Sequence, residues 1–330
     1  MEKGRTMKVA VIGGSGFIGS VLVSRLRGKA DVRIVDIATP PQTSRDLEFV
    51  RADVTLPDEI RSALQGCDLI VNLAAVHSDD VRPLSRYDEV NVDGAKNVCD
   101  AASALGVNRI LFTSSVAIYG FPQGAPDETV PANPFNAYGR TKKAAEVVYE
   151  SWAADQPDER RLVIVRPTVV FGPGNRGNVY NLMKQVTRKN FVLVGDGTNR
   201  KSMAYVENVA AFLEHLVFMP ATAGTAVYNY VDKPDFSMND LISKLRGALG
   251  LNPSPMVRLP YSVGLAIGSA FDIAAHLAGK TFPISRIRVQ KFCLNTTFTA
   301  ELLKETGFSP PVSLDDALGR VAVHEFGAAD

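Results

Sequence analysis

Cysteine and histidine are too few and too scattered in this chain to suggest a metal centre or a disulfide framework. The three cysteines are widely spaced, and the four histidines lack the spacing typical of metal ligands. Residues 1–7 are polar, and the most apolar later stretch, 261–271, is shorter than the ~20 residues of a bilayer-spanning helix. We therefore expect a cytoplasmic protein with reduced thiols, no signal peptide and no transmembrane helix.

The chain also lacks an excess of charge of either sign. Its net charge is +1, without a basic block or a basic amphipathic helix, so nothing indicates nucleic acid as a partner. The favoured interpretation of 261–271 is a buried helix, and a helix lying on a membrane surface is the alternative. Apolar residues make up 46% of the 330 residues and charged residues 22%, which is typical of a globular protein with one large or two modest domains.

Short apolar runs alternate with helical patterns through the first half of the chain. Strand-like runs occupy 8–12, 31–36, 47–52, 69–73, 109–113 and 162–166, and helical patterns occupy 17–27, 58–65, 90–105 and 138–152. This alternation predicts an α/β fold, in which helices cover both faces of a doubly wound parallel sheet. Ligands of such sheets bind at the carboxyl ends of the strands.

The pattern becomes less regular beyond residue 172. We expect a Rossmann domain over 1–172, to which 205–232 returns, and a smaller mixed substrate domain made of 173–204 and 233–330. The elements predicted in this half are helices at 208–218, 238–248 and 314–323 and a strand at 226–230. The loop 120–137 contains four prolines and no periodicity, which is typical of a functional or mobile segment.

Three glycines follow the first strand directly, as Gly13-x-x-Gly16-x-x-Gly19. Such a turn needs glycine where it bends sharply, where it approaches a pyrophosphate and where the next helix packs on the strand. The N–H groups that begin this helix attract phosphate. Asp36 ends the second strand, where a carboxylate accepts both ribose hydroxyls of an adenosine and repels a 2′-phosphate. The pattern predicts a dinucleotide site that prefers NAD to NADP.

Tyr138 and Lys142 stand four residues apart in a helical segment, so they lie on one face. A phenol titrates near about 10 in water. A nearby ammonium and the positive nicotinamide ring stabilise its ionised form. Ser115 follows the strand 109–113, where its hydroxyl can hold the reacting oxygen. A surface pair and a turn-capping serine are the alternatives. Behind a dinucleotide site, the three residues together predict hydride chemistry at a carbinol.

The order of further motifs resembles that of the extended short-chain dehydrogenases/reductases, and more narrowly the NAD-dependent epimerase/dehydratase family acting on nucleotide sugars. These motifs are Asp53-Val54, Asn72-Leu-Ala-Ala75, Asn91-Val92 and Arg166-Pro167 before Phe171-Gly172-Pro173. The resemblance covers about residues 7–230. It implies that Ser115, Tyr138 and Lys142 form the catalytic trio, with Lys142 also touching the nicotinamide ribose.

The resemblance further implies which residues contact NAD. Gly13, Gly16, Phe17, Ile18 and Gly19 are expected at the pyrophosphate, Asp36 at the adenosine ribose, Asp53 and Val54 beside the adenine, Ala74 and Ala75 at the ribose and phosphates, Asn91 at the strand-end backbone, and Pro167 to Val170 at the carboxamide.

Two departures from the family pattern narrow the activity. Val116 and Ala117 replace the Asp-Glu pair of the 4,6-dehydratases, so dehydration is not expected. Arg200-Lys201-Ser202 replaces the Arg-Asp-aromatic run of UDP-sugar epimerases. Arg200 or Lys201 would meet a diphosphate here, but lysine cannot make the paired hydrogen bonds of an arginine guanidinium. Further substrate contacts are predicted in the glycine-rich segment 172–178, with loop formation as the alternative: Asn175, Arg176 and Asn178.

The leading hypothesis is a nucleotide-sugar 4-epimerase that works through a 4-keto intermediate with tightly bound NAD, with a UDP-sugar favoured. A 4-ketosugar reductase using NAD(P)H is the alternative, and a non-catalytic dinucleotide-binding sensor or structural subunit is a third possibility. The apolar stripes of helices 90–105 and 138–152 are wide enough for a partner, and the resemblance implies a homodimer with a four-helix bundle. The segment 233–300 is expected to carry specificity.

Overall fold

The computed structural model describes residues 6–78, 81–121, 124–187, 191–220, 222–252, 257–278 and 285–327. The chain divides into two compact units. The first comprises 1–170, 204–231 and 298–311, and the second comprises 171–203, 232–297 and 312–330. Residues 298–311 therefore belong to the first unit, although the sequence division assigns them to the second. Hydrogen bonds from Thr299 to Pro126 and from Asn229 to Thr299 hold this segment in place, and such long-range contacts leave no local pattern.

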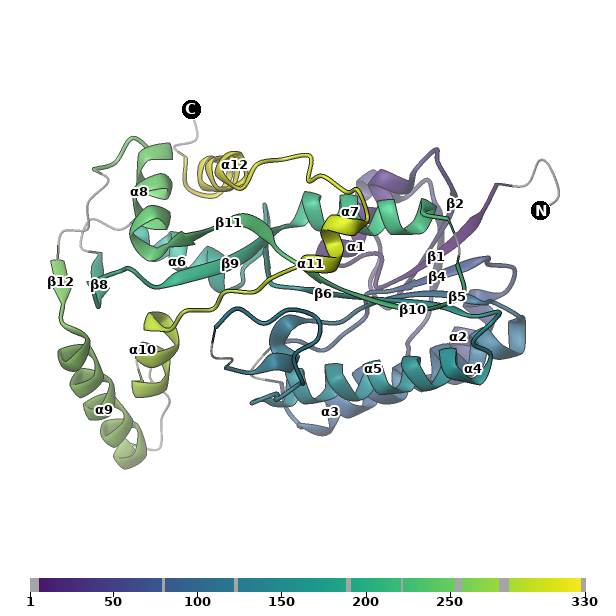
Figure 1. Cartoon of the computed structure of the whole chain (residues 1–330), viewed down its shortest axis with the longest axis horizontal. Helices are drawn as coiled ribbons and strands as arrows, with labels where there is room; N and C mark the ends of the chain where they lie inside the picture. The colour runs from purple at the N-terminus through teal and green to yellow at the C-terminus, as the bar shows by residue number, and fades with distance from the viewer. Residues whose placement is uncertain are drawn as a thin grey trace. The chain divides into compact units, whose positions relative to one another are not determined.

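A seven-stranded sheet forms the centre of the first unit (Figure 1), in the order β10-β6-β5-β4-β1-β2-β3. Its strands are β1 (Lys8–Ile12), β2 (Asp31–Asp36), β3 (Glu48–Arg51), β4 (Leu69–Asn72), β5 (Arg109–Thr113), β6 (Arg161–Pro167) and β10 (Gly224–Tyr230). All neighbouring strands pair in parallel. The predicted parallel α/β fold is therefore confirmed.

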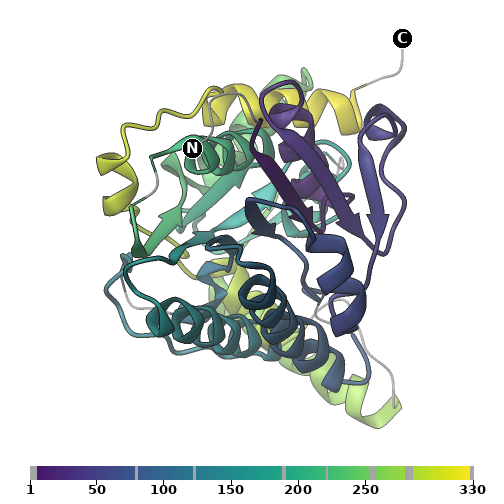
Figure 2. The ribbon, with the colours of Figure 1, turned by 90° about the vertical axis from the view of Figure 1, so that its right-hand side faces the viewer.

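Helices cover both faces of this sheet, as Figures 1 and 2 show. They are α1 (Phe17–Leu26), α2 (Pro57–Leu64), α3 (Ser85–Asp88), α4 (Gly94–Leu105), α5 (Ala137–Asp155), α7 (Val206–Phe218) and α11 (Glu301–Glu305). Side chains alternate along β1, so Ala10 and Ile12 pack with α2, α4 and α5, whereas Val9 and Val11 pack with α1 and α7. The inner strands β1, β4, β5 and β6 are buried on both faces, which explains why they are largely apolar.

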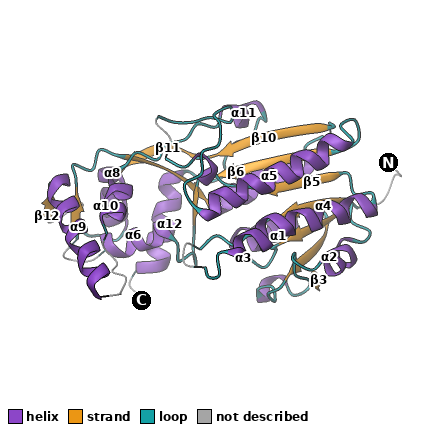
Figure 3. Cartoon of the chain, turned by 90° about the horizontal axis from the view of Figure 1, so that it is seen from below, coloured by secondary structure: helices purple, strands orange, loops and turns teal. Residues whose placement is uncertain are grey.

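The second unit is smaller and mixed. It is built on a three-stranded sheet, β11-β9-β7, and a two-stranded sheet, β12-β8, and Figure 3 colours the strands and helices separately. Its elements are β7 (Val169–Phe171), α6 (Asn178–Val186), β8 (Val192–Val194), β9 (Arg200–Tyr205), β11 (Asp232–Ser237), α8 (Met238–Ala248), β12 (Val257–Leu259), α9 (Tyr261–Ala278), α10 (Arg286–Cys293) and α12 (Leu314–Phe326). Ser237 and Ser313 cap α8 and α12 through their side chains.

Helix α9 departs from the sequence-based expectation. The favoured interpretation of 261–271 as a buried helix is wrong, because Val263 is 42% exposed and Ile267 is 38% exposed. Two glycines of this helix, Gly264 and Gly268, are buried instead. Within the part of the chain that the structure describes, no helix has the length and apolarity needed to cross a bilayer.

Candidate active site

The glycine turn after β1 has the geometry of an anion cradle. Gly13 has a φ of 77°, and a Cβ on Gly19 would lie 2.1 Å from the carbonyl oxygen of Gly13. Neither position therefore accepts a larger residue without strain. Gly16 caps α1 without a side-chain acceptor, and the first turn, which contains Phe17 and Ile18, has no acidic residue. The N–H groups at this helix start are thus open to a phosphate.

The turn lies beside the segment that follows β4. The sheet order reverses between β1 and β4, and this switch point is where doubly wound sheets bind their ligands. A Cβ on Gly13 would lie 2.9 Å from the backbone nitrogen of Ala74. The structure therefore brings the predicted pyrophosphate-binding turn next to Ala74 and Ala75, which are far apart from it in the sequence.

Asp36 is held at the carboxyl end of β2 by two backbone donors. Its Oδ2 accepts the N–H of Ser15 at 2.9 Å, and its Oδ1 accepts the N–H of Ala38 at 2.9 Å. Each carboxylate oxygen has a further lone pair that can accept a hydroxyl. The carboxylate is thus fixed and still suited to a ribose diol.

Asp53 and Val54 form a fixed turn between β3 and α2. The Oδ1 of Asp53 accepts the N–H and the hydroxyl of Thr55, at 2.9 and 2.8 Å. Val54 is buried, and a Cβ on Gly94 would lie 3.0 Å from its Cγ2. The side chains predicted beside the adenine are therefore held in place by Thr55 and by Gly94 of α4.

Asn91 connects the segment after β4 to α5. Its Oδ1 accepts the N–H of Val76 at 2.8 Å, and its Nδ2 donates to the carbonyl oxygen of Val76 at 3.0 Å and to the hydroxyl of Thr141 at 2.9 Å. Asn91 lies in a π-helical segment, Glu89–Asp93, a form often found at functional sites. It therefore anchors backbone at the strand ends, as the family resemblance implies.

Ser115 and Tyr138 lie close enough for the serine hydroxyl to lower the pKa of the phenol. Ser115 follows β5 and also accepts the N–H of Ala117 at 3.1 Å. Tyr138 lies in the first turn of α5, which Asn136 caps by accepting the N–H of Gly139 at 2.8 Å. A Cβ on Gly139 would lie 2.4 Å from the carbonyl oxygen of Ala117. The missing side chain of Gly139 thus lets α5 approach the serine segment.

Lys142 lies one helical turn beyond Tyr138 and is almost fully buried. Its exposed fraction is 2%, and its Nζ lies 4.2 Å from the centre of the Phe112 ring. Burial lowers the pKa of Lys142 to about 7, and the nearby carboxylate of Glu146 opposes this shift. The protonation of Lys142 near neutral pH is therefore sensitive to the charges around it.

Tyr138 differs from the sequence-based expectation in one respect. The spacing of Tyr138 and Lys142 predicts that the neighbouring ammonium favours the phenolate. In the protein alone, burial raises the pKa of Tyr138, although the hydrogen bond from Ser115 opposes the rise. Desolvation also lowers the pKa of Lys142 and thus reduces its positive charge. Ionisation of Tyr138 therefore requires a further positive charge nearby.

A buried polar network beneath the trio was not predicted. Arg166 donates to both carboxylate oxygens of Glu146, at 2.8 and 2.9 Å, and to the hydroxyl of Tyr119 at 2.8 Å. Tyr119 donates to Asn229 at 2.9 Å. Arg166, directly after the apolar run 162–165, was the available signal, because a buried charge requires a partner.

The predicted carboxamide contacts lie where the chain leaves the large sheet. Pro167 is the last residue of β6, and Val170 lies in β7. Between them, the N–H of Thr168 donates to the carbonyl oxygen of Tyr230 at 3.0 Å. This bond fixes the backbone path at the carboxyl end of the sheet.

The predicted substrate contacts of the second unit already have partners there. Arg176 pairs with Glu325, and the side chain of Asn175 accepts the N–H of Gly177 at 2.6 Å. Lys201 donates to the carbonyl oxygens of residues 291 and 294 at 3.1 and 2.6 Å, and burial lowers its pKa to about 8. Arg200 donates to the carbonyl oxygen of residue 235 at 2.8 Å. The side chain of Asn178 lies outside the described residues.

Comparison with known proteins identifies the family. A model of the NAD dependent epimerase/dehydratase family matches residues 9–229. The chain is 44% identical to the N-acetyl-alpha-D-glucosaminyl-diphospho-ditrans,octacis-undecaprenol 4-epimerase of Escherichia coli O157:H7, over 96% of this chain and 95% of that protein. It is 28% identical to the UDP-glucose 4-epimerase of Vibrio cholerae, over 95% and 94% of the two chains. The solved structure of MoeE5 in complex with UDP-glucuronic acid and NAD has a TM-score of 0.74 and 25% identity, over 96% and 97%.

These likenesses confirm several sequence-based predictions. The fold, the enzymatic nature of the protein, NAD as cofactor and a 4-epimerase as the activity all agree with them. The geometry of the glycine turn, Asp36 and the Ser115–Tyr138 pair fits the same cofactor and the same class of chemistry. The chain belongs to the NAD dependent epimerase/dehydratase family.

Proposed function

We propose that the protein is a 4-epimerase of an N-acetylhexosamine joined through a diphosphate to a polyprenol. The observation that carries the proposal is the placement of Ser115 at the end of β5 and of Tyr138 one helical turn before buried Lys142, with the glycine turn at the switch point of the same sheet. The substrate class is supported by the relative from Escherichia coli O157:H7, because the 44% identity extends over nearly the whole of both chains.

In this proposal the first unit holds NAD through the residues already described. The turn Gly13–Gly19 would receive the pyrophosphate, and Asp36 the adenosine ribose. When bound, NAD supplies the acceptor for the hydride of the sugar's carbon 4 and the source from which that hydride returns.

Tyr138 would act as the proton acceptor and donor of the reaction. Its phenolate takes the proton of the sugar's 4-hydroxyl while carbon 4 is oxidised, which gives a 4-keto sugar. After the sugar turns in its site, the phenol returns the proton as the ketone is reduced from its opposite face. Ser115 would donate a hydrogen bond to the reacting oxygen as charge develops there.

The pKa shifts explain why the cofactor matters to the acid–base step. Burial raises the pKa of Tyr138 and lowers that of Lys142 to about 7, so burial favours the uncharged form of both groups in the protein alone. A positive nicotinamide ring nearby would favour the phenolate. The base is therefore activated in the same state that can accept a hydride.

A homodimer built on α4 and α5, in a reducing cytoplasm, completes the proposal. Val147 on α5 is 50% exposed and offers an apolar contact for a partner helix. The three cysteines are free thiols, the state that a reducing compartment maintains. Light scattering of the purified protein would give its oligomeric state.

The proposal is tested with purified enzyme and N-acetylglucosaminyl-diphospho-polyprenol, without added reductant. We expect the 4-epimer to form and NAD to remain bound through purification. Tyr138→Phe should lower kcat by about 10²–10⁴-fold, the range of general acid–base catalysis. Tyr228→Phe, at a tyrosine packed against the core under α7, is the matched control and should keep its activity. Near-normal turnover by Tyr138→Phe would exclude the phenol from the mechanism.

A nucleotide sugar is the second candidate substrate, supported by the relative from Vibrio cholerae and by the MoeE5 complex. Comparison of UDP-N-acetylglucosamine with the polyprenol-linked substrate under the same conditions separates the two. A requirement for one equivalent of reduced cofactor per product would instead favour the 4-ketosugar reductase.

A further inference from the structure

One face of α9 carries apolar side chains that nothing in the described chain covers. Val263, Ile267 and Ile273 are 42%, 38% and 63% exposed. Three exposed alanines lie among them, and at 100° per residue all six fall within one third of the helix circumference. We call this surface the α9 apolar face: Val263, Ala266, Ile267, Ala270, Ile273 and Ala274.

The other side of α9 holds the helix in place through two glycines. A Cβ on Gly268 would lie 2.8 Å from the backbone of Arg286, at the start of α10, and a Cβ on Gly264 would lie 2.4 Å from Val194 in β8. Asp272 adds a hydrogen bond, because its Oδ2 accepts the N–H of Arg286 at 3.0 Å. Close packing on this side fixes which face points away from the unit.

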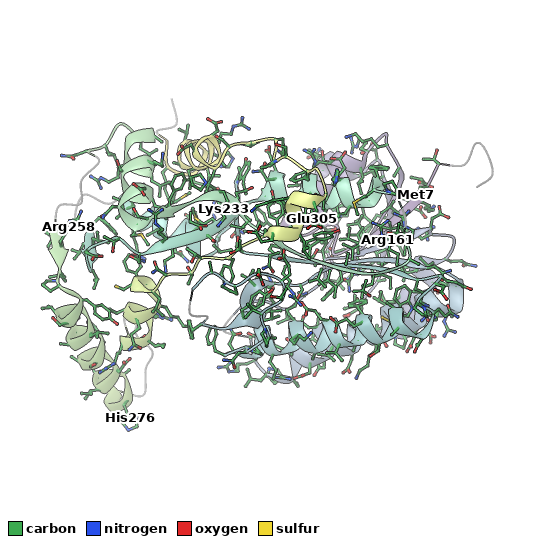
Figure 4. The ribbon with its side chains drawn as sticks, in the orientation of Figure 1. Met7, Arg161, Lys233, Arg258, His276 and Glu305 are labelled. Atoms are coloured by element: carbon green, nitrogen blue, oxygen red, sulfur yellow. The ribbon has the colours of Figure 1, made fainter. Side chains whose placement is uncertain are left out.

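The charged residues on β12, α9 and α10 are mostly basic. Arg286, Arg288 and Lys291 lie on α10, and Arg258 lies on β12, directly before α9. Asp272 is the only acidic residue in the described parts of 257–293. Figure 4 labels Arg258 and His276, which lie near opposite ends of α9. An apolar helix face in a segment with this excess of basic residues complements an anionic lipid surface.

A second copy of the chain fits this surface less well. The helix from 261 to 276 is about 24 Å long and about 10 Å wide, so one face offers roughly 240 Å². A stable interface needs about 800 Å² from each partner. Among the described residues no helix is long and apolar enough to cross a bilayer, which leaves an orientation of α9 parallel to the membrane.

We propose that the α9 apolar face inserts into the surface of an anionic phospholipid membrane, with the basic residues of α10 at the lipid headgroups. This inference rests on the proposed function in one respect, because a polyprenol-linked sugar is embedded in such a membrane. The α9 apolar face would bring the enzyme to a substrate that lies in the membrane. A water-soluble substrate would not require such membrane binding.

Vesicle flotation tests the inference without any measurement of activity. The full chain is mixed with phosphatidylcholine vesicles that contain about 30% phosphatidylglycerol, and bound protein floats with them. We expect Ile267→Ser/Ile273→Ser to weaken binding by about tenfold or more, because apolar burial drives insertion. The matched control is Leu251→Ser/Val323→Ser, which alters two side chains of the same unit with 37% and 55% exposure and should float like the wild type.

Charge is tested separately from apolar burial. Arg286→Gln/Arg288→Gln should weaken binding by about fivefold for each residue, and Arg286→Lys/Arg288→Lys should restore it. Wild-type protein that stays unbound, or that floats equally well after the isoleucine substitutions, would overturn the inference. So would a wild-type dimer that the isoleucine substitutions convert to a monomer, because a second copy would then cover the face.

Activity assays separate this inference from the proposed function. With a water-soluble, short-prenyl analogue of the substrate, Ile267→Ser/Ile273→Ser should turn over like the wild type. With long-chain substrate in vesicles it should lose about tenfold in kcat/KM. Wild-type protein that floats but turns over neither substrate would refute the proposed function, and the inference that the α9 apolar face binds membranes would still hold.

Discussion

The ion pair between Arg166 and Glu146 allows a quantitative test of how the site is supported. Both side chains are buried, with exposed fractions of 7% and 0%, and two hydrogen bonds of 2.8 and 2.9 Å join them. Burial alone would raise the pKa of Glu146, but the hydrogen bonds and the charge of Arg166 outweigh it and lower the pKa. Each charge is tolerated in the interior because the other is present.

Removal of one partner should therefore destabilise the first unit more than removal of both. Glu146→Gln leaves the guanidinium buried without a counter-charge, and such a loss typically costs about 3–5 kcal/mol. Arg166→Met removes two hydrogen bonds and the main counter-charge from the buried carboxylate, which keeps only Lys143, 3.2 Å away, as a cationic partner. The double variant buries no lone charge, and its main remaining loss is the hydrogen bond to Tyr119, about 1 kcal/mol. We expect it to be more stable than either single variant.

Urea unfolding followed by fluorescence measures this coupling. The chain has one tryptophan, Trp152, which is buried in α5 two turns beyond Glu146 and reports on the first unit. Because the pKa of Glu146 is lowered by folding, its contribution exists above its ordinary value of 4.5 and disappears as the pH falls through the folded value. Single-variant losses that simply add in the double variant would refute the reasoning.

Two further predictions concern the trio. Gly139→Ala should lower kcat by about tenfold or more, because a Cβ 2.4 Å from the carbonyl of Ala117 would move Tyr138 away from the serine segment. Gly319→Ala in α12 meets no atom within 4 Å, so it should stabilise the fold by about 0.5–1 kcal/mol and keep full activity; equal activities of the two variants would contradict the close-approach argument. The pKa of Lys142 is lowered to about 7, so wild-type stability relative to Lys142→Met should rise as the pH increases from 7 towards 10.5, since only the unfolded chain binds the proton there. A flat difference in unfolding free energy over this range would mean that the lysine is not desolvated.

The large sheet was predictable because its signals are local. Each of its inner strands β1, β4, β5 and β6 is a short, largely apolar run, because burial on both faces requires one. The glycine turn and Asp36 follow strand ends at fixed distances, so the sequence also places them on one edge. The return of 298–311 to the first unit depends on Thr299 and Asn229 meeting across a long stretch of chain, and no local pattern records that contact.

The candidate site was predictable in its reacting groups and not in their supports. Ser115, Tyr138 and Lys142 are recognisable because their chemistry requires those residue types. Gly139 and Glu146 act through distance and charge instead. A glycine in a helix usually indicates weak propensity, and only the tertiary approach to Ala117 shows that it sets the separation between α5 and the serine segment.

Helix α9 shows why apolar content alone does not decide burial. A run of valine, leucine, isoleucine and phenylalanine predicts a core helix as long as every face is assumed to have a neighbour. Here the two glycines, four residues apart, form the packed side and bring α10 close. The branched residues Val263, Ile267 and Ile273 occupy the opposite side, where nothing described covers them. When the small residues of a helix share one face and the large apolar residues share the other, the small face packs against the protein, and the large face is available to a partner that the chain does not contain.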